Sequence, residues 1–92
     1  MAGESRLTTD HEVIRRWAEE RGGRPATVRG TGAEGRPGIL RLYFPDYSTS
    51  RSLEEVSWDE FFRKFEESHL AFLYQEQTRD NHQSRFFKFI RR

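Results

Sequence analysis

The run Ser57-Trp58-Asp59-Glu60-Phe61-Phe62-Arg63-Lys64-Phe65 decides how the rest of the chain is interpreted. Ser57 and Glu60 have the spacing of a capping box, in which two side chains satisfy free backbone N–H groups at the start of a helix. The apolar residues of the run recur at i, i+3, i+4 and i+7, which places them on one helical face. The run therefore predicts a helix from Ser57 to about Ser68, with Phe61 and Phe65 buried against a sheet.

An earlier segment repeats this pattern. Thr9 and Glu12 form a second capping box, an apolar stripe follows, and Gly22-Gly23 permits a left-handed end, so we expect a helix over about residues 10–21. A shift of 48 residues lays residues 9–17 on residues 57–65 with hydroxyl on hydroxyl, Glu on Glu and Arg on Arg. We hypothesise a pseudo-repeat of two αββ units. The alternative is that two capped amphipathic helices simply look alike.

Four segments have the composition of strands, and each helix is followed by two of them. They lie at residues 26–29, 39–44, 70–74 and 85–90. The element order α-β-β-α-β-β, with one apolar stripe on each helix, predicts an α+β fold. We expect a four-stranded, mainly antiparallel sheet with both helices on one face, and an opposite face open to solvent or to a partner.

Length and composition indicate one domain of residues 9–92 preceded by a disordered tail of residues 1–8. Only 34% of the residues are hydrophobic, but eight Phe, three Tyr and two Trp can build a core. The absence of cysteine excludes disulfides, thiolate metal sites and cysteine nucleophiles. With no signal-peptide pattern and no long apolar window, we expect a cytoplasmic protein that does not enter a membrane.

No motif in the sequence predicts catalysis, a metal or a cofactor. Residues 30–35 match G-x-G-x-x-G, but a strand follows them instead of the helix that a nucleotide site needs, so they are interpreted as a hairpin loop. His11 lies beside two acids, an arrangement more typical of a solvated first helical turn than of a metal site. Trp17 and Trp58 could stack on sugars or bases, but their helical stripes favour core positions. We therefore expect a protein that is not an enzyme.

The C-terminal segment carries the main candidate site. Residues 79–92 contain five cations and one acid, whereas residues 38–78 have a net charge of −4. As a strand, the segment places Phe86, Lys88 and Ile90 on one face, and only one face can belong to the core. The opposite face and Lys88 supply the tentative binding residues, a mixture of rings and cations that suits bases and phosphates: Arg85, Phe87, Lys88, Phe89 and Arg91. The alternative is a Phe pair over a small core, followed by a basic tail.

Several stretches together resemble a group of short, uncharacterised bacterial proteins. They lie at residues 10–23, 25–28, 53–62, 70–75, 84–86 and 88–89, so the likeness covers about residues 8–92. Members often carry an automatic label as 1,4-α-glucan branching enzyme. Such an enzyme needs a catalytic barrel of about 250 residues, so this activity is not transferred, and the resemblance implies no catalytic residues.

The sequence thus predicts a small binding or regulatory module that uses an exposed sheet face and its basic, aromatic last strand. The expected partner is a protein or a single-stranded nucleic acid. The alternative function is that of an accessory carbohydrate-binding domain for glucans, which the label of the similar proteins suggests. A fluorescence titration with single-stranded nucleic acid at two salt concentrations separates these classes, because phosphate contacts weaken with salt.

Overall fold

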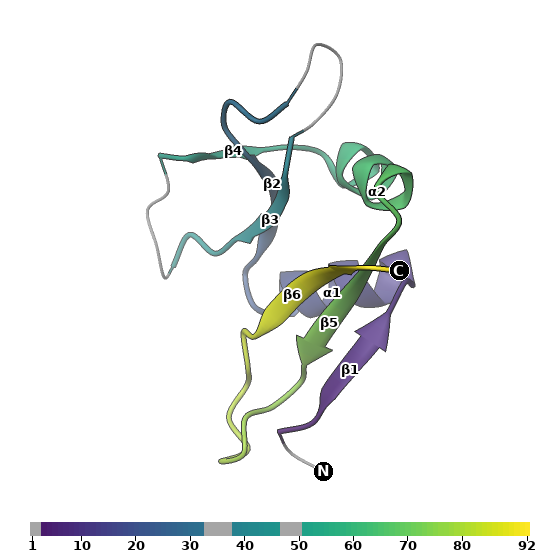
Figure 1. Ribbon diagram of the computed structural model, residues 1–92. Helices are drawn as coiled ribbons and strands as arrows, with labels where there is room; N and C mark the ends of the chain where they lie inside the picture. The colour runs from purple at the N-terminus through teal and green to yellow at the C-terminus, as the bar shows by residue number, and fades with distance from the viewer. Residues whose placement is uncertain (1–2, 33–37, 47–50) are drawn as a thin grey trace.

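The computed structural model describes residues 3–32, 38–46 and 51–92 and has an α+β fold (Figure 1). Both predicted helices are confirmed, and the two predicted hairpins are present. The elements, in chain order, are β1 (Ser5–Thr8), α1 (His11–Glu20), β2 (Arg24–Val28), β3 (Leu40–Tyr43), β4 (Leu53–Glu55), α2 (Trp58–Glu67), β5 (Leu70–Gln75) and β6 (Phe87–Arg91).

The strands form two antiparallel sheets of three strands, not the single four-stranded sheet that we expected. Their orders are β1-β5-β6 and β3-β2-β4. Each predicted hairpin becomes part of its own sheet because a third, short strand pairs with its first strand. Residues 5–8, expected in a disordered tail, instead form β1. β4 has the sequence Leu-Glu-Glu, which carries no strand pattern of its own.

The third strand of each sheet comes from the other half of the chain. β1 precedes α1 but pairs with β5, which follows α2, so that Leu7 lies opposite Leu73. In the same way, β4 precedes α2 but pairs with β2, which follows α1, so that Glu54 lies opposite Thr27. The two halves of the chain are therefore interlocked through a mutual exchange of strands.

The N-cap of α1 lies one residue later than expected, whereas that of α2 lies where it was predicted. Asp10 is the N-cap, not Thr9: its carboxylate accepts hydrogen bonds from the backbone amides of Glu12 (2.9 Å) and Val13 (3.4 Å). A carboxylate caps at least as well as a threonine hydroxyl and also suits the helix dipole. At α2 the cap is Ser57 as predicted, with its hydroxyl 3.1 Å from the amide nitrogen of Glu60. Both helices then contain ten residues.

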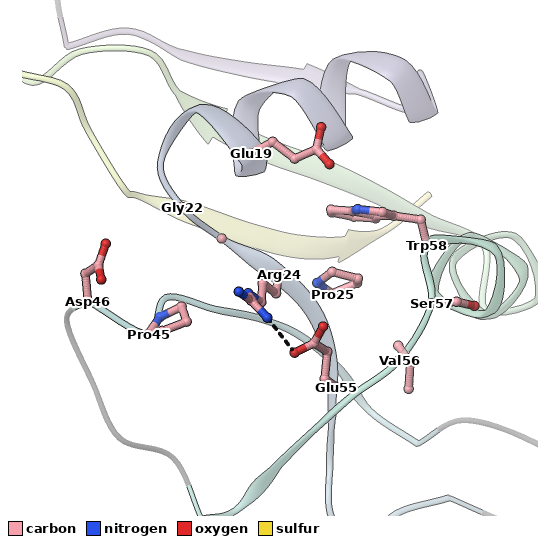
Figure 2. Close-up of a pocket in the computed structure, with 11 residues that line it drawn as sticks. Glu19, Gly22, Arg24, Pro25, Pro45, Asp46, Glu55, Val56, Ser57 and Trp58 are labelled. Carbon is pink, nitrogen blue, oxygen red and sulfur yellow. Dashed lines mark hydrogen bonds and ion pairs between the residues drawn. The ribbon is translucent and has the colours of Figure 1, made fainter.

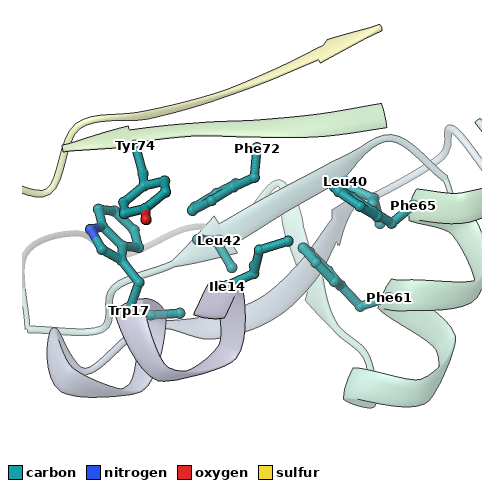
Figure 3. Close-up of a cluster of buried hydrophobic side chains, with 9 residues drawn as sticks. Ile14, Trp17, Leu40, Leu42, Phe61, Phe65, Phe72 and Tyr74 are labelled. Atoms are coloured by element: carbon teal, nitrogen blue, oxygen red, sulfur yellow. The ribbon is translucent and has the colours of Figure 1, made fainter. Parts of the chain in front are cut away.

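One hydrophobic core joins the two sheets and both helices (Figure 3). Phe61 and Phe65 are fully buried, which confirms the prediction made from the helical spacing. Trp17 is also core, at 1% exposure, and its indole N–H donates to the carbonyl of Gln75. The other main contributors are Ile14 of α1, Leu40 and Leu42 of β3, and Phe72 and Tyr74 of β5.

Candidate binding surface

β6 is an edge strand whose free side can be assigned from its hydrogen bonds. Phe86 accepts a bond from the amide of Gln75 (3.3 Å), and Arg92 donates one to the carbonyl of His69 (2.7 Å). In an antiparallel ladder, residues alternate between bonding their partner strand and pointing away from it. Residues 86, 88, 90 and 92 therefore bond toward β5. The amides and carbonyls of Phe87, Phe89 and Arg91 point to the free edge.

The side chains of β6 alternate as the sequence predicts, and the inner face carries two of the tentative binding residues. Phe87 and Phe89 lie opposite Tyr74 and Phe72. The ring centroid of Phe87 is 6.0 Å from that of Trp17, and the centroid of Phe89 is 5.8 Å from that of Phe61. Both rings therefore pack on the rim of the core and are only partly exposed.

The opposite side of the β1-β5-β6 sheet carries exposed apolar groups. Figure 1 shows α1 behind this sheet, whereas no described helix crosses its other side. Leu7 is 59% exposed and Phe86 is 46% exposed. Among the residues that register and alternation place there, we term the following five the open sheet face: Leu7, Leu73, Phe86, Lys88 and Ile90.

A groove with a volume of about 400 Å³ lies beside β6 and is lined by Arg41, Phe87, Lys88 and Phe89. It thus combines side chains of β6 with a cation of β3, one of the two edge strands of the other sheet. Arg91 is also exposed. The structure therefore brings Phe87, Lys88 and Phe89 together, and it adds Arg41, which sequence reasoning missed because β3 and β6 are far apart along the chain. Arg85 is exposed and lies just before β6.

A second groove, of about 600 Å³, lies where the end of α1 and the β3-β2-β4 sheet meet the start of α2 (Figure 2). The indole of Trp58 projects into it, and Arg24 and Glu55 form an ion pair there at 3.4 Å. Trp58 is also stacked on Phe62, with ring centroids 5.4 Å apart. Carboxylates of Glu19 and Asp46 complete a lining that offers one flat ring and several hydrogen-bond acceptors.

Arg21 is a buried cation that fixes the segment leading into β6. Its guanidinium donates to the carbonyls of Trp17 and Glu76, each at 2.9 Å, and to the carbonyl of Ser84. The same group lies 4.4 Å from the centroid of the Trp17 ring. Desolvation lowers the pKa of Arg21, and the nearby carboxylates of Glu76 and Glu20 oppose that shift. Its position directly after α1 gives no sign in the sequence that the guanidinium is buried.

A cluster of His11, Glu66 and Arg92 joins both helices to the end of β6. The Nε2 atom of His11 lies 2.7 Å from one carboxylate oxygen of Glu66, and Arg92 donates to the other at 2.9 Å. The hydrogen bond from His11, followed by that from Arg92, holds the pKa of Glu66 below its usual range. Across residues 3–32, 38–46 and 51–92, no group of three histidine or acidic side chains could hold a metal ion. The cluster links α1, α2 and the end of β6 through polar side-chain contacts.

Comparison with protein-family models, with curated proteins and with solved structures finds no match for this chain. The resemblance to the group of short bacterial proteins thus rests on its sequence stretches alone. Neither α1 nor α2, the two helices in the described part of the chain, is long and apolar enough to span a bilayer.

Proposed function

We propose that this protein is a non-enzymatic binding module that holds a protein partner on the open sheet face and along β6. The observation that carries the proposal is the exposed apolar side of the β1-β5-β6 sheet, where Leu7 lies on the edge strand β1 and Phe86 directly precedes the other edge strand, β6. Contiguous exposed apolar groups rimmed by polar ones are typical of interaction sites. Their burial stabilises a complex by about 25 cal/mol for each Å² removed from water.

The position of the aromatic rings supports a protein partner over a nucleic acid. Single-stranded nucleic acids bind to rows of exposed rings on which bases stack, flanked by several cations. Phe87 and Phe89, the rings that would serve this purpose, pack toward Trp17 and Phe61. The open sheet face instead offers mainly aliphatic side chains with a single cation, Lys88.

We also propose that the chain consists of two related αββ units. The matching strand orders of the two sheets support this. In each sheet, the first strand of a hairpin pairs with the short strand that precedes the helix of the other unit. The caps Asp10 and Ser57 are 47 positions apart, one fewer than the 48 of the sequence comparison, and Arg41 and Lys88 have the same spacing. The two cations of the β6 groove would then be equivalent residues of two equivalent edge strands.

The test is a selection of peptides from a random display library, followed by affinity measurements on variants. Selected peptides should lose at least about tenfold in affinity, roughly 1.4 kcal/mol, when Leu7→Ser and Phe86→Ser are combined. Ile39→Ser is the matched control, because Ile39 is a similarly exposed aliphatic residue, at 51%, outside the proposed surface.

Equal losses in the double variant and in the control contradict the proposal. Single-stranded RNA and DNA are titrated in parallel at low and moderate salt. Salt-sensitive binding of these, without peptide binding, would replace the protein partner by a nucleic acid.

A second candidate function is carbohydrate binding in the groove of Trp58. It is favoured by the projecting indole, which can stack on a sugar ring, and by the carboxylates of Glu19 and Asp46, which can accept bonds from hydroxyls. Titration with linear gluco-oligosaccharides should change tryptophan fluorescence in the wild type. Trp58→Phe should abolish the change, because the remaining Trp17 is buried. A signal that survives in Trp58→Phe rules out this groove.

A further inference from the structure

The free edge of β6 and the cations around it define what kind of segment would bind there. We propose that the partner presents an extended, acidic segment that adds to β6 as a fourth strand of the β1-β5-β6 sheet. This inference rests on the proposed function, because it names the partner chemistry of the same surface.

The backbone of β6 supplies the main bonds. Phe87, Phe89 and Arg91 direct their amides and carbonyls away from β5, as the bonds of Phe86 and Arg92 at the two ends of the ladder require. An added strand can pair with all three residues over a span of about 13 Å. Main-chain pairing of this kind gives affinity, and the neighbouring side chains give specificity.

The neighbouring side chains favour acidic residues. Arg41 and Lys88 line the groove beside the edge, and Arg91 is exposed at its end. Within the described residues, none of these three cations forms an ion pair with an acidic side chain. Among the other arginines that the structure describes, at least five are already paired with glutamates: Arg15, Arg21, Arg24, Arg29 and Arg92. The cations around β6 can therefore meet carboxylates of a partner without breaking an existing pair.

A second copy of the chain fits this edge less well. The acidic edge strand of the protein is β4, whose Glu54 and Glu55 could face the cations of β6. Both carboxylates are already engaged, with Arg29 at 3.5 Å and with Arg24 at 3.4 Å. A separate acidic segment therefore has the better charge complementarity.

The first experiment compares a short labelled peptide of alternating Glu and Val with the same peptide carrying Lys in place of Glu, by fluorescence anisotropy. The acidic peptide should bind at least about tenfold more tightly, and the preference should shrink as salt rises. Arg41→Glu combined with Lys88→Glu should abolish the preference. Equal binding of the two peptides to the wild type would overturn the inference.

The second experiment separates main-chain pairing from simple charge attraction. Arg91→Pro and Arg91→Ala remove the same charge, but only the proline variant removes an outward-pointing amide, and an edge strand tolerates proline there. Arg91→Pro should bind the acidic peptide about three- to tenfold more weakly than Arg91→Ala. Equal affinities in two folded variants would contradict strand addition.

Amide hydrogen exchange on the wild type gives a readout that needs no variant. Saturating acidic peptide should slow exchange at Phe87, Phe89 and Arg91, whereas Lys88 and Ile90 are already bonded to β5. If library peptides depend on Leu7 and Phe86 but show neither acidic preference nor this protection, strand addition fails and the proposed function stands. If acidic peptide protects the three amides but no ligand depends on Leu7 and Phe86, the open sheet face fails and the edge remains.

Discussion

The imidazole of His11, in the first turn of α1, lies 2.7 Å from the carboxylate of Glu66 in the last turn of α2, although 55 positions separate the two residues. The same carboxylate receives a bond from Arg92. Both partners stabilise its charged form, so the pKa of Glu66 is lower in the folded protein than in the unfolded chain. This difference couples the protonation of one side chain to the stability of the fold.

Glu66→Gln should flatten the acid side of the stability profile. A carboxylate whose pKa is depressed by folding stabilises the protein above its unfolded pKa, about 4.3. That stabilisation is lost as the pH falls through the folded pKa. The variant should therefore be less stable than the wild type near neutral pH, and the two should converge below about pH 4. Urea denaturation across this range checks this; Glu67→Gln is the control, and parallel curves for Glu66→Gln and wild type would contradict it.

Arg21→Met should destabilise the protein by about 2–4 kcal/mol, because three carbonyls lose a buried donor. The stability of Arg21→Lys should lie between that of the wild type and that of Arg21→Met, since an ammonium cannot reach all three acceptors with the geometry of a guanidinium. Urea denaturation provides the measurement. Arg16→Met, on the exposed side of the same helix, should change stability by less than about 0.5 kcal/mol. A loss at Arg21 no larger than this would show that the buried bonds add nothing.

Phe65→Ala should cost about 3–5 kcal/mol, because a fully buried ring leaves a cavity in the core. A domain of this size has about 5–10 kcal/mol in total, so much of the population should unfold near body temperature. The measurement is the melting temperature, recorded by circular dichroism during heating. Phe86→Ala serves as the exposed counterpart and should melt within a few degrees of the wild type. An unchanged melting temperature for Phe65→Ala would refute its place in the core.

Asp10→Ala should lower the stability by about 1 kcal/mol, whereas Thr9→Ala should have little effect. The reason is that the Asp10 carboxylate, not the Thr9 hydroxyl, accepts from the amides of Glu12 and Val13. Asp10→Ser should retain most of the capping. Denaturant midpoints for the three variants distinguish the two caps. A larger loss of stability in Thr9→Ala than in Asp10→Ala would show that Thr9 is the N-cap of α1, as the sequence predicts.

The helices could be predicted because their information is local. Ser57 and the aromatic spacing after it define α2 without reference to the rest of the chain, and the left-handed Gly22 (φ +72°) ends α1 as expected. β1 and β4 could not be predicted in this way. Each is short and polar and becomes a strand only because β5 or β2 offers it an edge.

The last strand and the alternation of its side chains could be predicted from the sequence, but which of its faces is buried could not. Whether Phe87 or Phe86 turns inward depends on where Trp17 and Phe61 lie, and those positions follow from contacts across the whole chain. Arg41 and Arg21 were missed for the same reason. One reaches the β6 groove from another sheet, and the other is buried by a loop that follows more than fifty residues later.

The exchanged strands also set an order of events during synthesis on the ribosome. Ser5 pairs with Gln75, and Val28 pairs with Leu53, so the N-terminal half cannot complete either sheet when it emerges. The apolar stripe of α1 therefore lacks its packing partners Phe72 and Tyr74 until almost the whole chain has been translated. Pairings this distant along the chain slow folding and leave apolar surface exposed in the nascent chain. The first forty residues are therefore the part of this protein whose apolar side chains stay longest without their packing partners during synthesis.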